Sequence, residues 1–501
     1  MVSEGKAPSD AAALSSGTGH ERVWGPPIFV LGGLQLLVVL DGTVVALALP
    51  QVRSALKLSE ADGNWIITAY VLAFGGLMLL GGRLGDTFGR KRVFTAGVAF
   101  FTLASLLCGI AWDPAVLIAG RALQGVAAAI AAPTAMALVA TTYAPGRARS
   151  QAFAFYAAVT GIGSVIGLVA GGVLTELSWR LIFLINVPVG VLVTLGAIRW
   201  LRESRGARTA LDVSGAVLGT VGVTLAVYAV NAGPGGWTRP AVLAPAAVAV
   251  LALIAFVVVE RRAANPLLPF ALFRNSSRVA ALTAMAFAGA IMMCLAVFIS
   301  LYLQGVLRYS PLQAGMAVIP FAFGLAIAAT VSARLALRVQ PRWLVVGGGV
   351  IILAGCLYAA RIVGQQPAYF PAIAIPVLVI GFGFGFATIP LTLSIIAGVG
   401  ESEIGPLTAL AQVVPNLGGA LGLVAVGALV TSRIQAEGGV TDPAAPLTAL
   451  QSAALASGYG VAFVSCAVIA LLAGIAVLFM RFTPADVAEG QAAQEAAHAG
   501  I

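Results

Sequence analysis

Histidine, lysine and charge of either sign are scarce in this chain of 501 residues. The two histidines, His20 and His498, lie in the polar ends, which excludes a histidine proton relay inside an apolar segment. No Gly-x4-Gly-Lys-Ser/Thr sequence occurs, and no long polar region could form a soluble domain that holds ATP. No His-Glu-x2-His or paired-cysteine sequence occurs either, so the sequence predicts no metal site and no cofactor.

Cysteine is also rare and dispersed. Each of the four cysteines sits alone within an apolar segment, which is not the pattern of a disulfide framework or a metal site. We interpret all four as small packing residues. They are Cys108, Cys294, Cys356 and Cys466.

Apolar residues, by contrast, make up 60% of the chain, and the mean hydropathy is +1.00. A soluble protein cannot bury that much apolar surface, so we expect an integral membrane protein. A helix crosses the hydrocarbon layer with about 20 apolar residues. On this measure the sequence predicts an all-α protein with fourteen transmembrane helices, approximately at 28–50, 64–82, 93–112, 115–140, 151–175, 181–200, 211–231, 240–260, 279–304, 312–333, 343–362, 370–398, 404–431 and 455–481.

The basic residues predict how these helices are oriented. With the N-terminus in the cytoplasm, 20 of the 28 Lys and Arg residues fall in cytoplasmic segments and 7 in outer loops, while Arg121 lies within a span. This distribution follows the positive-inside rule. We therefore expect a multi-pass cell-membrane protein with both termini in the cytoplasm. The net charge of +9 then reflects topology and is not a sign of nucleic-acid binding.

The densest cluster of charge is the stretch 82–92, between the second and third apolar segments. Asp86 and Arg90 are four residues apart, close enough to pair if the stretch is helical. Three glycines allow a tight turn and a close approach to a neighbouring helix. A basic cytoplasmic loop explains the arginines but neither the acid nor the glycines. The candidate gating residues are Gly82, Asp86, Gly89, Arg90 and Arg92.

Two charged side chains lie inside apolar segments. Asp41 is near the middle of the first one, where a carboxylate costs on the order of 3 kcal/mol unless it faces a cavity or a partner. Burial favours its neutral form, so Asp41 is a candidate proton carrier, unless it only hydrogen-bonds a neighbouring helix. Arg121 cannot lose its proton and needs a carboxylate or several carbonyls, and a purely structural role is its alternative.

Further candidates lie in and after the fifth apolar segment. Gly163, Gly167 and Gly171 recur every four residues and form one flat stripe for close helix packing. Glu176 follows at the outer end of this segment, where it could pair with Arg180. For Glu176, a proton-coupling role and a merely structural one are equally open.

Other polar and aromatic side chains in apolar segments could line a substrate path. Aromatic side chains in such segments usually pack against lipid or neighbouring helices, which is the alternative for each of them. The candidates are Trp65, Tyr70, Gln124, Tyr302, Gln304, Phe382, Phe386, Gln412 and Asn416.

Several of these stretches resemble one known family. Residues 82–92 resemble the signature loop between the second and third helices of the major facilitator superfamily. The residues from Asp41 onward resemble the first-span motif of its fourteen-span drug:proton antiporters, with Ala46 in place of the usual Asn. Residues 117–125 resemble the fourth-span motif. The glycine stripe resembles the antiporter motif, with Leu168 where the family has Pro.

The resemblance implies a major facilitator fold that works by alternating access. It implies that the first and fourth spans adjoin, so that Arg121 lies within reach of Asp41 and controls its protonation. It also implies that the charged loop is a cytoplasmic latch. The Leu at 168 removes an expected kink, which argues against simple drug:proton antiport. This Leu and the runs 68–86 and 163–169 are most similar to the EfpA-type efflux pumps.

A weak internal repeat predicts how the chain is divided. Residues 333–342 look like a worn copy of 82–92, with Leu337 in place of the Asp. The copy follows the tenth span as the original follows the second, which predicts two six-helix halves with two inserted helices. The predicted units are an N-terminal tail (1–27), an N-terminal half (28–203), the inserted pair (204–264), a C-terminal half (265–482) and a C-terminal tail (483–501).

These features predict a proton-coupled antiporter that exports hydrophobic or amphipathic compounds, and not an enzyme. Its expected partners are small hydrophobic drugs or lipids, protons and membrane lipids. The main alternative is export of lipid-like molecules along a path that opens sideways to the bilayer, with drug resistance as a by-product. An intramembrane enzyme would need a reactive polar cluster at one depth, and only Asp41 and Arg121 are deeply placed. A non-transporting sensor would bind a ligand without any flux.

Overall fold

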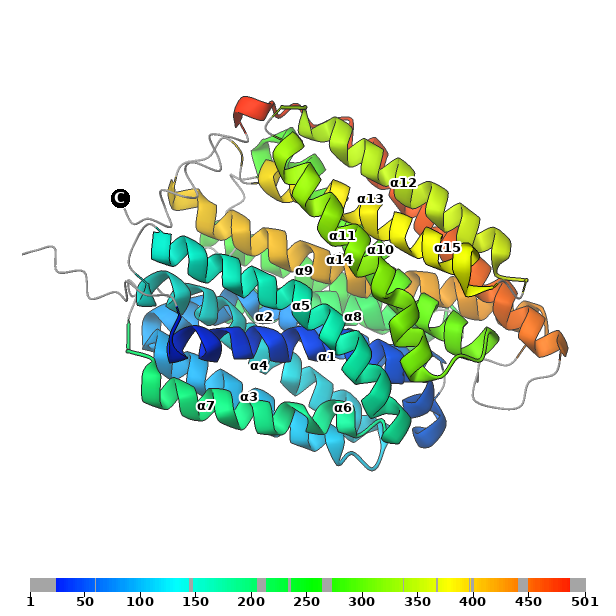
Figure 1. Ribbon diagram of the computed structural model, residues 1–501, viewed down its shortest axis with the longest axis horizontal. Coiled ribbons are helices and arrows are strands. Elements are labelled where there is room, and N and C mark those ends of the chain that lie inside the picture. Colours follow the sequence, from blue (N-terminus) through cyan, green and yellow to red (C-terminus); the bar gives the residue numbers. More distant parts are fainter. Residues whose placement is uncertain are drawn as a thin grey trace, which may run out of the picture.

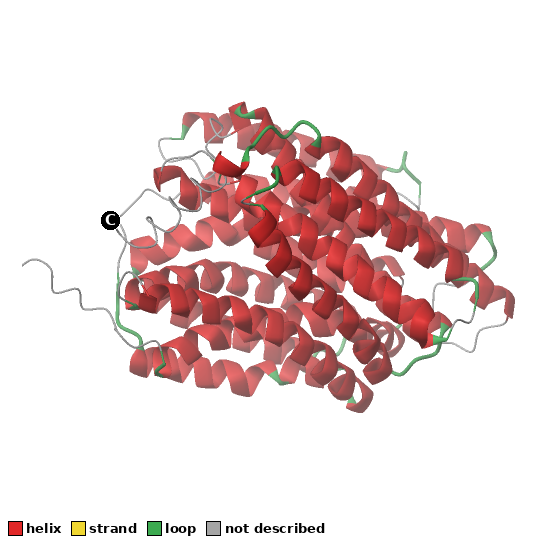
Figure 2. Ribbon diagram, turned by 45° about the horizontal axis from the view of Figure 1, so that its top comes forward, coloured by secondary structure: helices red, strands yellow, loops and turns green. Residues whose placement is uncertain are grey.

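The computed structural model describes residues 24–58, 60–143, 147–204, 213–232, 236–263, 273–336, 338–365, 368–395, 397, 401–439 and 449–486. Their regular elements are helices, which confirms the all-α prediction. The helices lie side by side and are joined by connections at two ends of the bundle (Figures 1 and 2). We call these ends the Pro26 end, where the first helix begins, and the Lys57 end, where that helix finishes.

The first seven helices come from the N-terminal part of the chain, and we call them the N-terminal half. They are α1 (Pro26–Leu56), α2 (Glu60–Phe88), α3 (Arg90–Gly109), α4 (Pro114–Thr142), α5 (Arg147–Leu177), α6 (Leu181–Leu184) and α7 (Asn186–Trp200). The single predicted span 181–200 is interrupted at Ile185, between α6 and α7. The interruption fits Pro188, which has no N–H to continue the hydrogen-bond ladder of α6.

The remaining helices form an inserted pair and a C-terminal half. The pair is α8 (Val213–Ala232) and α9 (Pro240–Arg262), which pack against each other. The C-terminal half consists of α10 (Ser276–Leu301), which continues as the π-helix η4 (Tyr302–Val306), α11 (Pro311–Leu335), α12 (Pro341–Ile362), the π-helix η5 (Tyr369–Ile373), α13 (Ala374–Ile395), α14 (Glu401–Ala436) and α15 (Ala449–Val477).

Eleven helices in the described part of the chain are long and apolar enough to cross a membrane. α2 is a twelfth if its two pieces, Gly63–Met78 and Leu80–Phe88, count as one span despite a bend of 52° between them. Shorter apolar stretches lie in α5 (Val165–Leu177) and α8 (Ser214–Val230). Each predicted range therefore overlaps a helix, while the number fourteen itself stays a prediction.

Many helices begin at a proline or at a capping side chain. Pro suits the first turn because the N–H that it lacks would have no helical partner there. The helices with Pro in the first turn are α1, α4, α9, α11 and α12. α11 also has a capping box, in which Ser310 and Gln313 each accept from the other's backbone N–H. These local signals fix where the chain turns at both ends of the bundle.

α4 carries a proline inside the membrane-spanning part, and α2 packs on it. Pro133 has no N–H, so the carbonyl of Ala129 loses its helical partner. The backbone of Gly81 in α2 lies against this carbonyl so closely that a Cβ on Gly81 would collide with its oxygen. Glycine is therefore required at this crossing, where α2 and α4 are in extensive contact.

The C-terminal half repeats this arrangement with a different residue. Pro390 in α13 leaves the carbonyl of Phe386 without its helical partner. The hydroxyl of Ser332, in α11, donates to that carbonyl oxygen at 2.9 Å. α11 and α13 are the tenth and twelfth predicted spans, as α2 and α4 are the second and fourth. The shared proline position supports the predicted repeat of two halves.

The inserted pair lies beside the junction of the two halves. α8 packs against α2 of the N-terminal half and against α14 of the C-terminal half. Gly76 lets α8 approach, since a Cβ there would meet the side chain of Thr220 at 2.6 Å. The rings of Trp65 and Tyr228 meet at the same contact, with centroids 6.2 Å apart. Thus Trp65 contacts the inserted pair in this structure.

Candidate functional site

The N-terminal half encloses an ion pair between α1 and α4. Nη1 of Arg121 lies 2.5 Å from Oδ2 of Asp41, and the two side chains are 1% and 0% exposed. An uncompensated charge at this depth is costly, so each residue supplies what the other needs. The structure thus brings together the two deep charges that the sequence singled out.

Neutral polar groups complete the surroundings of this pair. Gln124, one turn after Arg121, accepts from Arg121 Nη1 at 2.8 Å and donates to Asp41 Oδ1 at 3.1 Å. It also donates to Ser105 Oγ on α3 at 2.7 Å. Asn186 at the start of α7 donates to Asp41 Oδ1 at 3.4 Å. Three side chains therefore donate to the Asp41 carboxylate, and a fourth, Ser105, holds one of the three. We call these four residues and Asp41, which come from four helices, the Asp41 cluster.

The guanidinium of Arg121 also contacts α2 at two points. Its Nε donates to the carbonyl of Ile66 in α2 at 2.9 Å. Its Cζ lies 4.4 Å from the ring centroid of Tyr70, within cation–π distance. Arg121 therefore has partners for its charge besides Asp41, and it can keep them if Asp41 becomes neutral.

Two buried polar atoms in this region make no hydrogen bond. They are the hydroxyl of Tyr70 and Oδ1 of Asn186. Buried polar atoms usually have partners, so unpaired ones need a reason. Asn186 already donates to Asp41, and its free oxygen could accept the proton of a neutral Asp41 after a rotation of the amide. The cluster thus has an unused acceptor for the protonated state.

The residue after Asp41 is open. Gly42 is exposed, although it lies within the membrane-spanning part of α1. A Cβ on Gly42 would meet no atom within 4 Å. Ala46 lies on the same face one turn later, and this face contacts α10 of the C-terminal half. The buried cluster and the open face between the halves are therefore adjacent on α1.

The charged stretch forms a tight corner at the Pro26 end. Asp86 is in the last turn of α2 and Arg90 begins α3, and Oδ1 of Asp86 accepts from Nε and Nη2 of Arg90 at 2.8 and 2.6 Å. Gly89 has a φ of +104°, a conformation that favours glycine. The predicted loop is thus reduced to one turning residue between two helices, and the predicted i, i+4 pair is formed.

Glu203 also belongs to this corner, and sequence reasoning did not single it out. Its carboxylate accepts from the backbone N–H of Lys91 at 3.0 Å and of Arg92 at 3.3 Å, at the N-terminus of α3. It also lies 3.7 Å from Nε of Arg92. An acid at a helix N-terminus satisfies free N–H groups and the helix dipole. A lone acid after the sixth span, where basic residues prevail, was the available signal.

The remaining gating candidate, Gly82, and the glycine stripe lie at helix contacts. A Cβ on Gly82 would meet Pro133 of α4 at 3.7 Å, an ordinary contact. The stripe of α5 faces α1: Gly163 lies against Leu36 and Val39, Gly167 against Thr43 and Leu40, and Gly171 against Val44. The stripe therefore brings α5 close to the helix that carries Asp41.

Glu176 lies away from the Asp41 cluster. It is exposed, and its Oε1 accepts from the backbone N–H of Leu312 at the N-terminus of α11 at 3.3 Å. Arg180 donates instead to the carbonyl of Ala111 at 2.9 Å and stacks on Trp179. The pair of Glu176 and Arg180 that the sequence allowed is not formed. Glu176 links the halves at the Lys57 end.

The structure distributes the substrate-path candidates over several environments. Tyr70 and Gln124 are buried in or beside the Asp41 cluster, and Trp65 contacts α8. The ring of Tyr302 is buried against Phe463, with centroids 6.4 Å apart, and its hydroxyl makes no hydrogen bond.

The other candidates are on the later helices. The rings of Phe382 and Phe386 stack with centroids 5.8 Å apart, and Phe386 lies against Gly347 of α12. Asn416 of α14 lies against Gly75 of α2, at the junction of the halves. The side chain of Gln412 lies outside the described residues. Of the nine candidates, Asn416 and Gln304, which is described below, are the two with described contacts between the halves.

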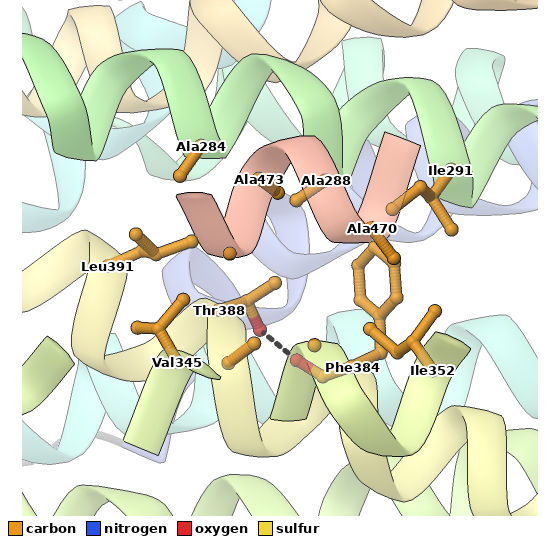
Figure 3. A pocket seen from close by; sticks show the side chains of 13 residues that line it. Ala284, Ala288, Ile291, Val345, Ile352, Phe384, Thr388, Leu391, Ala470 and Ala473 are labelled. Carbon is orange, nitrogen blue, oxygen red and sulfur yellow. Dashed lines mark hydrogen bonds between the residues drawn. The ribbon is translucent and has the colours of Figure 1, made fainter. Parts of the chain in front are cut away.

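Two cavities differ in size and chemistry. One of about 460 Å³ opens at the Lys57 end, between the end of α1, Trp179 and the segment that follows η4. The other, shown in Figure 3, is about 20 Å³ and lies between α10, α12, α13 and α15. Seven of its thirteen lining residues are Ala or Gly, and its Thr388 hydroxyl already donates to the Phe384 carbonyl at 2.9 Å. Only the first has room for a drug-sized group.

Residues 31–423 match the model of the Major Facilitator Superfamily. The "Uncharacterized MFS-type transporter EfpA" of Mycobacterium tuberculosis is 47% identical over 474 residues, which cover 94% of this chain and 89% of that protein. "Puromycin resistance protein pur8" of Streptomyces alboniger is 39% identical over 429 residues, which cover 85% of each protein.

Among solved structures, a bacterial homologue of the human lysosomal transporter Spinster, in an inward-facing and occupied conformation, matches with a TM-score of 0.66. The match covers 90% of this chain and 96% of the other, at 16% identity, so it concerns the fold alone.

Proposed function

The chain belongs to the major facilitator superfamily, and we propose that it is a proton-coupled exporter of hydrophobic or amphipathic drugs. The observation that carries the proposal is the buried Asp41–Arg121 ion pair next to the open face of α1 at Gly42. The similarity to a puromycin resistance protein supports drugs as the substrate class.

In this mechanism Asp41 takes up a proton from outside and releases it inside. The carboxylate is stable while Arg121, Gln124 and Asn186 donate to it. A proton that enters along the open face neutralises it and breaks the ion pair. Arg121 then keeps the Ile66 carbonyl and the Tyr70 ring as partners, so it remains in place. The two protonation states therefore favour different packing of α1 against α4.

Three hydrogen bonds between the halves lie toward the Lys57 end. Ser300 and Gln304 of the C-terminal half donate to the carbonyls of Ala46 and Leu47 in α1. Glu176 accepts from the N-terminus of α11 at the same end. We assign the Lys57 end to the outside, because basic residues concentrate at the Pro26 end. On this assignment the structure corresponds to a state that is closed to the outside. We place both termini on the cytoplasmic side of the cell membrane.

We assign the Asp86–Arg90 corner to a cytoplasmic latch. The charges of Asp86, Arg90 and Glu203 hold the joint between α2 and α3 at the Pro26 end. Because their side chains are only partly buried, the pairs contribute modestly and can rearrange when the halves move. The predicted halves, 28–203 and 265–482, would be the moving bodies, and 204–264 would follow them.

The test is export of a lipophilic fluorescent dye from proteoliposomes, with and without a pH gradient. Asp41→Asn keeps the size of the side chain but cannot release a proton. We expect it to abolish the acceleration by the gradient while protein remains folded. Asp113→Asn is the matched control, because Asp113 caps the start of α4 by accepting from the N–H of Val116, and Asn keeps that acceptor.

The proposal fails if Asp41→Asn retains full gradient-driven export. If Glu176→Gln also loses the gradient drive, the proton-coupling role predicted for Glu176 is supported. If dye moves equally with and without a gradient, labelled lipids should replace the dye, since lipid export is the alternative substrate class.

A further inference from the structure

α1 continues for a turn and a half beyond a proline at the Lys57 end. Pro50 lies inside the helix, and its nitrogen carries no hydrogen. The carbonyl of Ala46, four residues earlier, therefore lacks the helical partner that any other residue at 50 would provide. A buried carbonyl without a partner is unfavourable, so this oxygen requires a donor from outside α1.

The donor comes from the other half of the molecule. The hydroxyl of Ser300, which is 2% exposed in α10, lies 3.0 Å from the Ala46 oxygen. Nε2 of Gln304, one turn later, donates to the Leu47 carbonyl at 2.9 Å and to the Ser300 hydroxyl at 2.9 Å. Both N–H groups of the Gln304 amide are thus engaged, and the Ser300 hydroxyl is left to donate to Ala46.

These contacts lie between two spaces on the same face of α1. Pro50 and Gln304 line the 460 Å³ cavity that opens at the Lys57 end. Gly42, on the opposite side of Ala46, is the open position beside Asp41. These hydrogen bonds therefore lie between Gly42 and the outer cavity. An exported molecule would have to pass them to leave the space between the halves.

We propose that Ser300 and Gln304 close the outer side of the transporter by holding the carbonyl that Pro50 releases, and that this contact must break in each export cycle. We call it the outer clasp. The inference rests on the proposed alternating access and adds to it two positioning residues. Because Pro50 removes the competing helical bond, α1 binds α10 in the closed state. When the clasp opens, the Ala46 carbonyl can bind water from the outer cavity.

The chain provides a matched control for this chemistry. Ser332 donates to the carbonyl of Phe386, which Pro390 releases, at 2.9 Å, and Ser332 is 0% exposed. This bond has the same donor and the same kind of acceptor as the clasp, but it joins two helices of one half. Loss of Ser332 should therefore weaken the C-terminal half without favouring either state of the transporter.

The experiment measures access to a cysteine at Gly42 from outside intact cells, with a membrane-impermeant maleimide. Labelling requires the outward-open state, and the four native cysteines are buried. We expect Ser300→Ala to raise the labelling rate about fivefold, as loss of one hydrogen bond shifts an equilibrium between two states. Ser332→Ala should leave the rate unchanged, and Ser300→Thr, which keeps the hydroxyl, should restore the original rate.

A second measurement tests the part played by the proline. Pro50→Ala restores an N–H to pair with the Ala46 carbonyl within α1. In this background Ser300→Ala should change labelling much less than about fivefold, a coupling that a double-mutant cycle measures. The inference is overturned if Ser300→Ala leaves labelling unchanged, if Ser332→Ala raises it equally, or if Pro50→Ala does not reduce the effect.

The labelling experiment adds no substrate and imposes no pH gradient, and it compares variants in the same cells. Failure of the clasp would therefore leave the proton-coupling proposal untouched, and loss of gradient-driven export in Asp41→Asn would say nothing about the clasp. Labelling from the cytoplasmic side in inverted vesicles adds a further criterion. A shift toward the outward-open state lowers it in Ser300→Ala, whereas general loosening of the protein would raise labelling from both sides.

Discussion

The interiors of the two halves differ although their helices are arranged alike. The N-terminal half buries a carboxylate and a guanidinium together with Gln124, Ser105 and Asn186. Among the described residues of the C-terminal half, the one buried charged side chain is Arg278, near the Pro26 end, where it donates to the carbonyls of Ile395 and Ala397. At mid-depth this half has instead a small apolar cavity (Figure 3).

This difference indicates a division of labour. On the proposed mechanism a change of protonation acts on the N-terminal half, because that half contains the described carboxylate, Asp41, that joins neighbouring helices within the membrane. The C-terminal half responds through the contacts that it makes with α1, α2 and α5. The comparison therefore predicts that substitutions that remove a buried charge lower stability most in the N-terminal half. Substitutions that disturb packing should lower stability in both halves.

The largest expected effect comes from breaking the ion pair in the N-terminal half. Arg121→Met leaves the Asp41 carboxylate buried without its cation, which should destabilise the protein by about 3–5 kcal/mol. Asp41→Asn combined with Arg121→Met leaves no charge and should recover most of this loss. Thermal denaturation of the purified protein in detergent measures both.

Arg278→Met is the corresponding change in the C-terminal half. Arg278 donates to the neutral carbonyls of Ile395 and Ala397, and we expect the loss of these two bonds to cost about 1–3 kcal/mol, less than the loss of Arg121. Equal losses in Arg121→Met and Arg278→Met would remove the distinction between the halves. A double variant no more stable than Arg121→Met would show that the pair is not one energetic unit.

The next effect concerns the two carbonyls that prolines release within the halves. Gly81→Ala forces a Cβ against the Ala129 carbonyl of α4 and should cost about 1–3 kcal/mol. Ser332→Ala leaves the Phe386 carbonyl without its donor and should cost about 1 kcal/mol. Denaturation midpoints compare them. A tolerated Gly81→Ala would mean that α2 and α4 can separate without loss, against the close contact described here.

A smaller effect on stability is expected at the α2–α3 corner, where Glu203 caps α3, than at the contacts within the halves. Glu203→Ala removes the cap of α3, which should cost about 1 kcal/mol and lower the rate of export. At the repeated position, α12 begins with Pro341 and has no side-chain cap. Glu203→Gln keeps an acceptor and should lie between Glu203→Ala and the original protein. Dye export at low and high salt tests whether the charge matters, because salt screens partly exposed charges.

The sequence predicts those parts of the site whose signal lies within one segment, and misses those that depend on contacts between distant helices. Asp41, Arg121 and the Asp86–Arg90 pair could be identified because charge is rare in apolar segments and because four residues make one helical turn. The family resemblance further placed Arg121 near Asp41. By contrast, Asn186, Ser105 and Glu203 are ordinary residues in their own segments. Only the packing of distant helices shows that they contact the charged groups.

Proline shows the same limit. A proline within a helix predicts a bend and a carbonyl without its helical partner, as at Pro50, Pro133 and Pro390. The prolines do not predict which neighbouring residue contacts each carbonyl. That neighbour is Ser300 across the halves in one case, and Gly81 or Ser332 within a half in the others. Gln304 shows the same limit: the sequence predicts it as a path residue, but only the packing shows that its amide N–H groups also hold α1 and Ser300.

The smallest expected effect comes from two glycines with equal space around them. Gly42 in α1 and Gly474 in α15 are both helical, and a Cβ on either would meet no atom within 4 Å. Alanine at each should stabilise its helix by about 0.5–1 kcal/mol. The consequences for export should differ. Gly474 lines the small apolar cavity of Figure 3, so Gly474→Ala should leave export unchanged.

Gly42→Ala should combine higher stability with slower export, because its methyl group narrows the face of α1 between the Asp41 cluster and the outer clasp. Denaturation midpoints and dye export, measured on the same preparations, separate the two properties. Equal export by both variants would place the substrate path away from this face of α1. Slower export by Gly474→Ala alone would place the substrate path in the C-terminal half, contrary to the roles assigned to the two halves here.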